Sequence, residues 1–272
     1  MPSSPPARRP RRRVRIGTLW IDAVDLPEAL AEIEALVDSG TGGAVYTPNV
    51  DHVVQAESNE RFRHAYEQAS LSLADGAPLL WVARLLGCPL PGKVSGSDIL
   101  VPLMELAARR GWRVYVLGGA PGVAEAAARL LAERLGVSVV GADSPTVGPD
   151  GSELGGSSVP RIRAAKADLL LVALGAPKQE LWIHQADGAL GPTVALGIGG
   201  TLDFLVGRLR RAPRWISKAG LEWLFRLMQE PRRLWRRYLV EDARFPLIVL
   251  ATWWLPRSER ISERGLPSDD PC

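Results

Sequence analysis

The chain has 272 residues, of which 46% are hydrophobic and 23% charged, and its formal net charge is only +3. The apolar content excludes disorder throughout and fits one globular domain, with or without an appendage. The two cysteines lie far apart and the three histidines lack HExxH-type spacing, so we expect neither a disulfide framework nor a cysteine or histidine metal site.

Arginine gathers at the two ends of the chain. Residues 1–13 combine proline, serine and arginine with no apolar segment behind them, which predicts a disordered basic tail rather than a signal peptide. Residues 257–272 are predicted to form a second disordered tail. The apolar run 245–255 is interrupted by Pro246 and is shorter than the roughly 20 residues that span a bilayer, so no transmembrane helix is expected.

Between the tails, short β-rich runs alternate with helical stretches over residues 14–207. This alternation predicts an α/β fold, a Rossmann-like and mostly parallel sheet flanked by helices. The expected strands or hairpins are residues 15–21, 44–47, 71–73, 113–117, 137–140, 168–174 and 193–198. The expected helices include residues 26–38, 50–68, 79–86, 123–135 and one that opens at Pro177.

The composition changes after Gly207, where arginines interleave with tryptophan, tyrosine and phenylalanine. We expect residues 208–256 to form a separate helical appendage. Its composition is typical of an amphipathic helix at a membrane surface. The alternative is a solvated basic helix that packs on the core by its tryptophan face.

In open α/β sheets, ligands bind beyond the carboxyl ends of the strands. Small or polar residues stand at five of these positions, which predicts a shared cleft. The candidates are Thr47 and Asn49, Asp75, Gly118 and Gly119, Gln179, and Asp203.

The glycine-rich turn at residues 118–122 precedes a helix, and the N-terminus of a helix favours phosphate. The turn matches neither the dinucleotide fingerprint nor the P-loop. The alternative is a tight connection that needs small residues.

Three polar candidates each have a structural alternative. Asp75 could act as a general base or a cation ligand, or it could cap the following helix. Gln179 could hold a sugar hydroxyl or a phosphate, while Glu180 beside it could complement the helix dipole. Asp203 could bind a ribose or a base edge, or cap a turn.

Eight ordered segments carry a family resemblance. They are TPNVDH (47–52), ADGAP (74–78), LGGAPG (117–122), ADL (167–169), VALGAPKQE (172–180), GIGGTLD (197–203), RAP (211–213) and GLEWLFR (220–226). The ordered set resembles glycosyltransferase family 26, the WecG/TagA/CpsF family, over residues 15–238. The tail from residue 241 to residue 272 departs from the shorter members.

The resemblance implies an inverting, metal-independent transfer, without a cofactor, from a UDP-sugar to a sugar on a polyprenyl diphosphate, in the synthesis of a cell-surface polysaccharide or teichoic-acid-type polymer. The donor is UDP-N-acetylmannosamine in TagA-like members and carries glucose or glucuronic acid in others. By match to the motifs, Asp75 is the general base and Thr47 the second catalytic candidate.

The remaining candidates are substrate-binding residues. The resemblance implies that Asn49 lines the cleft with Thr47, that Gly118, Gly119 and Gln179 contact the diphosphate or sugar, and that Asp203 contacts the uridine. Without a metal, cations must stabilise the departing UDP. The candidates for that role are Arg226, Arg233 and Arg236, and Arg211 is a further substrate-binding candidate.

We therefore expect a cytoplasmic protein held peripherally at the inner face of the membrane, with no nucleic-acid partner; a homo-oligomer stays open. One alternative is an epimerase or dehydrogenase acting on nucleotide sugars, but the dinucleotide fingerprint and a Tyr-x-x-x-Lys pair are both missing. The other is a nucleic-acid-binding protein that uses the basic C-terminal segment. It leaves the five strand ends without a role.

Overall fold

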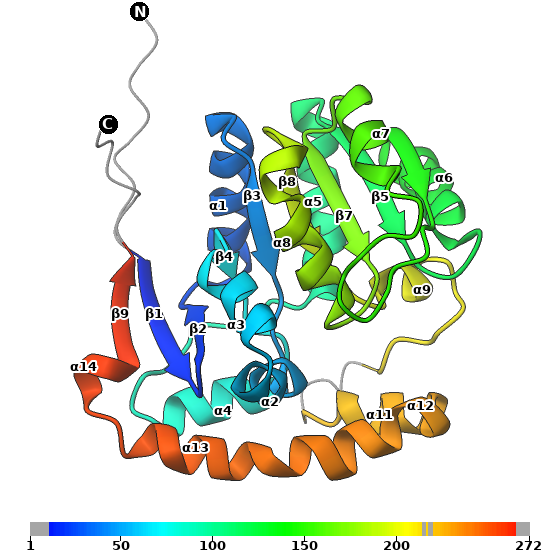
Figure 1. The fold of residues 1–272 in the computed structure, drawn as a ribbon. Helices are drawn as coiled ribbons and strands as arrows, with labels where there is room; N and C mark the ends of the chain where they lie inside the picture. The colour runs from blue at the N-terminus through cyan, green and yellow to red at the C-terminus, as the bar shows by residue number, and fades with distance from the viewer. Residues whose placement is uncertain (1–10, 214–215, 217–219, 265–272) are drawn as a thin grey trace, which may run out of the picture.

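The computed structural model describes residues 11–213, 216 and 220–264. Its centre is a six-stranded parallel sheet with strand order β4-β3-β8-β7-β5-β6 (Figure 1). The strands are β3 (Gly43–Tyr46), β4 (Leu71–Ser72), β5 (Arg113–Gly118), β6 (Ser138–Asp143), β7 (Leu169–Ala173) and β8 (Val194–Gly197). The predicted α/β fold with a Rossmann-like parallel sheet is confirmed.

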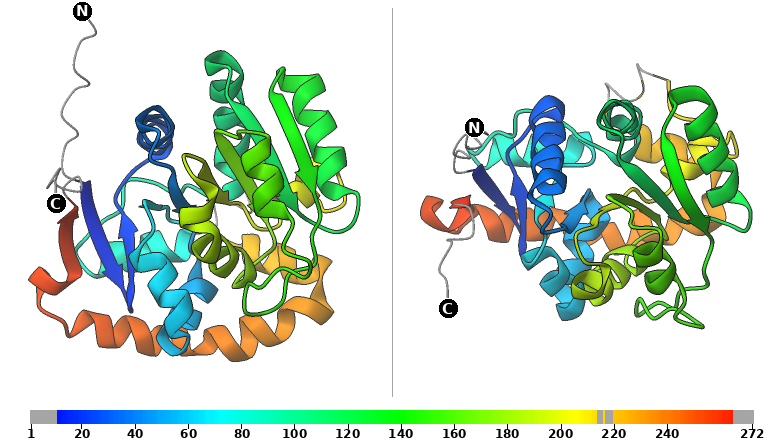
Figure 2. Two further views of the ribbon diagram at one scale, coloured as in Figure 1. Left: turned by 45° about the horizontal axis from the view of Figure 1, so that its top comes forward. Right: turned by 90° about the horizontal axis from the view of Figure 1, so that it is seen from above.

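Helices cover both faces of this sheet, as Figure 2 shows from above. On one face the core includes side chains of α1 (Leu26–Ser39), α5 (Gly96–Arg110), α6 (Val123–Leu135) and α9 (Thr201–Leu205). On the other it includes α2 (Val50–Ser58), α3 (Glu60–Glu67), α4 (Ala77–Leu85), α7 (Ser158–Ala164) and α8 (Lys178–Leu190). Every residue of β7 is buried, with alternate side chains in the two cores, which explains its continuous apolar sequence.

Local capping sets where several helices begin. Asp25 caps α1 and forms a capping box with Glu28, so that α1 begins at Leu26, where the sequence predicts a helix. The single helix expected at residues 50–68 is instead two helices. Asn59 has φ −110° and ψ 97°, outside the helical region, and its side chain caps α3 by accepting from the Phe62 amide.

A second sheet joins the two ends of the described chain. It is antiparallel, with the order β2-β1-β9, and consists of β1 (Arg11–Ile16), β2 (Leu19–Asp22) and β9 (Ile261–Arg264). The expected tails are therefore too long: residues 11–13 lie in β1, and residues 257–264 form α14 (Arg257–Arg260) and β9. Arginine-rich composition concealed the first residues of β1, whose end lies within the strand or hairpin expected at residues 15–21. In the fold, Arg11 bonds to the Ser70 carbonyl and pairs with Glu32.

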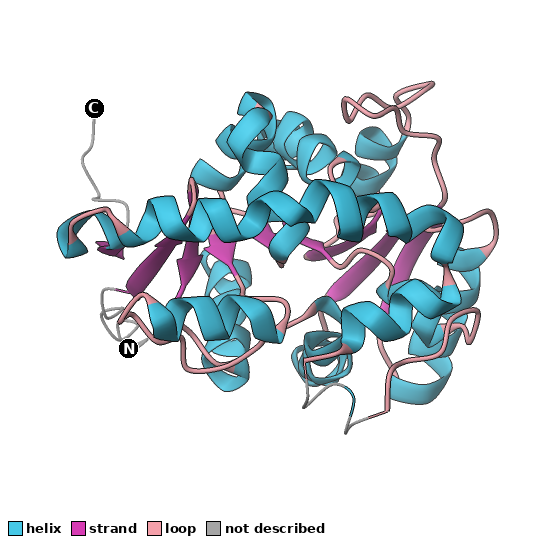
Figure 3. Cartoon of the chain, turned by 90° about the horizontal axis from the view of Figure 1, so that it is seen from below, coloured by secondary structure: helices cyan, strands magenta, loops and turns pink. Residues whose placement is uncertain are grey.

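The appendage crosses below the carboxyl ends of the parallel strands (Figures 1 and 3). It consists of α11 (Glu222–Gln229), α12 (Pro231–Arg236), the π-helical turn η1 (Arg237–Glu241), the short helix η2 (Asp242–Arg244) and α13 (Phe245–Trp253).

Helix α13 has one side on the core and one side in solvent. Phe245, Val249 and Thr252 are buried, and the Thr252 hydroxyl accepts a hydrogen bond from the Gly17 amide at 2.9 Å. On its other side Leu247 is 68% exposed, and Trp254 just after the helix is 80% exposed. The apolar run therefore both packs on the core and presents an apolar surface.

Candidate active site

A cavity of about 130 Å³ lies between the strand ends and the appendage. Six of the residues predicted from sequence line it: Thr47, Asn49, Asp75, Gln179, Arg211 and Arg226. They come from the ends of β3 and β4, the start of α8, the segment after α9, and α11. The topology thus brings residues far apart in the chain to one place, as expected for parallel strands.

A larger cavity of about 510 Å³ adjoins the first. Gly119 and Asp203, both predicted from sequence, line it together with Lys178 and Arg208. Gly175, Gly199 and Gly200 line both cavities. These eight predicted residues therefore fall into two adjoining compartments rather than one cleft.

Gly118 lines neither of these cavities. Its φ is +106°, and a Cβ there would lie 2.6 Å from the Ala173 carbonyl oxygen. The next amide, that of Gly119, donates to the same oxygen at 2.8 Å. The first glycine of the turn is thus required by the close approach of β5 to β7, which is the structural alternative for that position.

Asp75 does not cap a helix. The N-cap of α4 is Gly76, with φ +106°, and no side chain caps that end. The Asp75 amide donates to the Pro48 carbonyl at 2.8 Å, and its carboxyl group faces the smaller cavity.

Burial raises the pKa of Asp75 from 3.8 to about 6. Lys93 and Arg226 oppose this rise in pKa, whereas Glu222 and Asp98 add to it. A carboxylate with a pKa in this range is a stronger base than an exposed aspartate and is still ionised at neutral pH, as a general base requires.

Thr47 and Gln179 are both fixed to the end of β8. The Thr47 hydroxyl donates to the Gly197 carbonyl at 3.1 Å, and Gln179 Oε1 accepts from the Gly199 amide at 3.0 Å. Gln179 Nε2 donates to Glu180 Oε1 at 2.7 Å. These bonds set the direction in which the amide and the hydroxyl face the cavity.

Sequence reasoning missed a buried pair, His52 and Glu180. His52 Nε2 lies 3.3 Å from Glu180 Oε1, and His52 Nδ1 lies 2.7 Å from Asn49 Oδ1. Asn49 Oδ1 also accepts a hydrogen bond from the backbone amide of His52. The side-chain nitrogen Nδ2 of Asn49 is therefore left as the group available to the cavity. Both residues stand within matched motifs, but no local pattern shows that they meet.

The predicted arginines occupy different places. Arg226 lines the smaller cavity, with its guanidinium 5.6 Å from the centre of the Phe204 ring. Arg211 donates to the Ser97 carbonyl and pairs with Asp98. The side chain of Arg233 lies outside the described residues.

Arg236 differs from the sequence interpretation. Its side chain is 75% exposed, pairs with Glu241 and lines neither of the two cavities. The neighbouring Arg237 lines the smaller cavity instead and pairs with the buried carboxylate of Asp51. Neighbouring residues of a helical turn point in different directions, so sequence alone left the choice between them open.

Among the described residues, no group of three or more histidine, cysteine, aspartate or glutamate side chains is placed to hold a metal ion. Within the same residues, no helix combines the length and apolar character needed to cross a bilayer.

Comparison with known proteins defines the class. The family model described as "Glycosyl transferase WecG/TagA/CpsF family" matches residues 14–259, so the chain belongs to this family and is a glycosyltransferase. The match extends beyond the limit at residue 238 expected from sequence, through the appendage and α13.

One curated relative is a protein of Bacillus spizizenii, an N-acetylglucosaminyldiphosphoundecaprenol N-acetyl-beta-D-mannosaminyltransferase. It is 32% identical over 204 residues, which cover 75% of this chain and 77% of the relative.

Proposed function

We propose that the protein transfers a hexosyl group from a UDP-sugar to a sugar on a polyprenyl diphosphate, with inversion and without a metal, in the synthesis of a cell-surface polymer. The observation that carries the proposal is Asp75, a partly buried residue whose carboxyl pKa is raised, in a cavity also lined by Arg226 and Arg237. A base and cations in one cavity are the two elements that a single displacement at an anomeric carbon needs.

In this reaction Asp75 accepts the proton of the acceptor hydroxyl while that oxygen attacks the anomeric carbon. The bond from the anomeric carbon to the β-phosphate oxygen breaks, and UDP leaves with an added negative charge. In the proposed reaction Arg226 and Arg237, which line the same cavity, balance that charge. Among the described arginines, they take the role for which the sequence suggested Arg226 and Arg236.

The adjoining compartments suggest where the donor lies. The larger cavity holds the carboxylate of Asp203, which can accept hydrogen bonds from ribose hydroxyls, and the cations Lys178 and Arg208. We assign the nucleoside to this cavity and the sugar to the smaller one beside Asp75. The glycines shared by both cavities would let the diphosphate pass close to the backbone.

The relative's name supports a lipid-linked acceptor, because the N-acetylglucosamine that it glycosylates is carried by diphosphoundecaprenol. The same name favours N-acetylmannosamine as the transferred sugar. Family membership favours this enzyme over the nucleotide-sugar-modifying and nucleic-acid-binding alternatives.

Thermal stabilisation by UDP-sugars tests the proposed function. In the presence of EDTA, the cognate UDP-sugar at about 100 times its Kd should stabilise the protein by about 2.7 kcal/mol, which raises Tm by a few degrees. UDP should act similarly, whereas NAD should have no effect. Stabilisation that requires a divalent metal would contradict metal independence, and a response to NAD in place of UDP would contradict the donor class.

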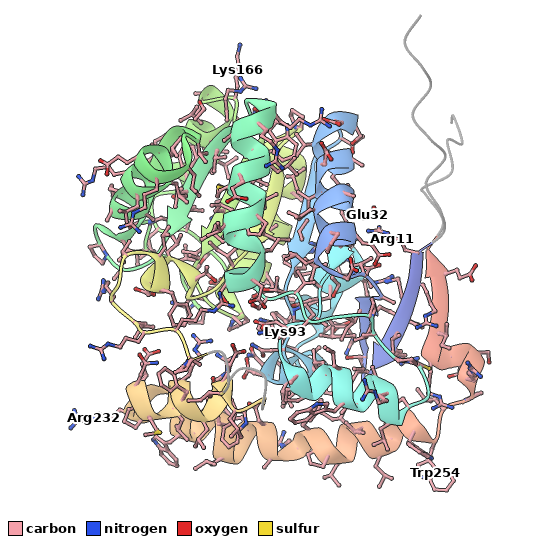
Figure 4. The ribbon with its side chains drawn as sticks, turned by 180° about the vertical axis from the view of Figure 1, so that it is seen from behind. Arg11, Glu32, Lys93, Lys166, Arg232 and Trp254 are labelled. Carbon is pink, nitrogen blue, oxygen red and sulfur yellow. The ribbon has the colours of Figure 1, made fainter. Side chains whose placement is uncertain are left out.

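An apolar surface on the appendage and α4 supports docking on a membrane. Its exposed side chains are Trp81, Leu85, Trp223, Met228, Trp235, Leu239, Leu247, Leu250, Trp253 and Trp254. Exposed arginines interleave with them, and Figure 4 shows Arg232 and Trp254 on the outer side of the appendage. Apolar and cationic side chains on one face suit an anionic lipid surface. Since a UDP-sugar is supplied by the cytoplasm, we place this docking at the inner face.

Replacing Leu247, Leu250 and Trp254 together by serine should lower binding to anionic vesicles at least about tenfold, because each buried apolar side chain contributes about 1.5–3 kcal/mol. Cosedimentation with vesicles measures this. Transfer to a water-soluble acceptor should stay unchanged, since these side chains face away from the core. Leu154→Ser, at an exposed leucine in the loop before α7, is the matched control. Equal vesicle binding by all three proteins would refute the docking surface.

A further inference from the structure

Lys93 lies where the catalytic core meets the appendage (Figure 4). Its Nζ is 3.1 Å from Asp98 Oδ2 in the first turn of α5 and 3.0 Å from Glu222 Oε2 at the start of α11. The three side chains are largely buried, with 19%, 22% and 27% of their surfaces exposed in the order Lys93, Asp98 and Glu222. A single ammonium group therefore joins the core to the appendage.

The same lysine stands beside Asp75. The Val94 amide donates to the Ala74 carbonyl at 2.8 Å, so the segment that carries Lys93 runs next to the end of β4. Glu222 and Asp75 both line the smaller cavity. The charged groups that act on Asp75 are Lys93 and Arg226, which favour its ionised form, and Glu222 and Asp98, which oppose it.

Two of these four groups, Glu222 and Arg226, belong to α11 of the appendage, and two belong to the core. When α11 is docked, Glu222 shares the ammonium of Lys93 with Asp98, and the appendage helps to remove water from Asp75. When α11 departs, Lys93 loses one carboxylate partner and Asp75 gains water. Both changes favour the ionised carboxylate. Loss of Arg226 acts in the opposite direction, but burial is the largest cause of the raised pKa of Asp75, so the pKa falls on departure and the carboxylate becomes a weaker base.

We propose that Lys93 and Glu222 are positioning residues, a Lys93–Glu222 latch through which docking of the appendage prepares Asp75 to act as the base. The inference rests on the proposed role of Asp75 and adds to it a means of confining strong base catalysis to the docked state. Neither residue was a candidate from the sequence. The latch combines a residue between α4 and α5 with one that follows it by more than a hundred positions.

The test is the titration of Asp75 in two variants that should shift the pKa of Asp75 in opposite directions. Lys93→Met removes a cation and leaves Glu222 facing Asp75, so the pKa of Asp75 should rise by about one unit. Glu222→Gln removes an anion and frees Lys93 to act on Asp75, so the pKa should fall by a similar amount. Lys93→Arg should stay close to the wild type.

The readout is the carboxyl ¹³C shift of Asp75 in the full-length protein, assigned with Asp75→Asn, together with the acid limb of the pH profile of transfer. Lys166→Met and Glu133→Gln, at sites away from the cavity, are the matched controls and should leave the titration unchanged. If Lys93 and Glu222 only supported the fold, both variants would lose structure, and the pKa of Asp75 would shift in the same direction in both. Shifts of the same sign in both variants, or no shift in either, would overturn the latch.

Failure of the latch can be told apart from failure of the proposed function. Suppose that the two variants shift the ¹³C titration of Asp75 in opposite directions, but the protein transfers no sugar from any UDP-sugar. The coupling of Lys93 and Glu222 to Asp75 would then stand, and the proposed transfer reaction would be rejected. Normal transfer with unchanged titrations would reject the latch and retain the reaction.

Discussion

Replacing Asp75 by asparagine should lower the transfer rate by about 10²–10⁴-fold and should make the folded protein more stable at neutral pH. The rate falls because an amide cannot accept the proton of the acceptor hydroxyl. Binding of UDP should persist, because asparagine retains the shape of the side chain and the proposed nucleoside cavity lies next to the base rather than around it.

The stability change follows from the pKa of Asp75, which burial raises from 3.8 to about 6. The folded protein therefore holds this proton more tightly than the unfolded chain does. The stability that protonation contributes is fully present below about pH 4 and is lost as the pH rises through about 6. At pH 7.5 the ionised Asp75 lowers the free energy of unfolding of the wild type, whereas asparagine does not ionise. The variant should therefore be more stable by roughly 1–3 kcal/mol.

Thermal melts at pH 4 and pH 7.5 measure the effect, with Asp38→Asn on the exposed end of α1 as the control. The gain should appear at pH 7.5 and shrink at pH 4. A variant that melts earlier than the wild type at both values would restore a structural role for Asp75, such as the helix cap considered from the sequence.

Replacing Arg237 by methionine should release the appendage and reduce transfer by about a hundredfold. Arg237 pairs with Asp51, which is buried at the start of α2 and also accepts a hydrogen bond from Gln55. Removing one partner of a buried ion pair leaves the other charge uncompensated, which costs about 3–5 kcal/mol. Since η1 holds the appendage against α2, that cost falls on the docked state.

The adjacent Arg236 provides a matched control. Its pair with Glu241 is largely exposed, and such pairs contribute about 0–1 kcal/mol, so Arg236→Met should leave the appendage docked. Hydrogen exchange of residues 222–244 should show rapid exchange in Arg237→Met only. Adding Asp51→Asn to Arg237→Met should recover much of the protection, because the buried charge is then gone. Equal exchange in the two single variants would show that the pair does not hold the appendage.

The sequence predicted the sheet because its signals are local. The apolar run of β7 and the small residues after each strand require no knowledge of distant contacts, and the order of parallel strands then gathers Thr47, Asp75 and Gln179 at one edge. The family resemblance added the role of Asp75, which residue type and position alone left divided between base and cap.

The interpretations that failed depend on contacts between distant segments. Strand β9 forms only because β1 offers an edge about 250 residues earlier. Glu180 does lie in the first turn of α8, where it can complement the helix dipole, but its burial against His52 of another helix could not be predicted from the local sequence. Arg236 and Arg237 are chemically identical neighbours, and only the direction of one helical turn separates them.

The pairing of β9 with β1 makes the appendage a closed loop that is attached to the core at both ends. Residues 220–260 can therefore leave the strand ends only by bowing outward, and they cannot diffuse away. A segment tethered in this way meets its docking site again at an effective concentration in the millimolar range. Return to the docked state is thus an intramolecular event, independent of the amount of protein present.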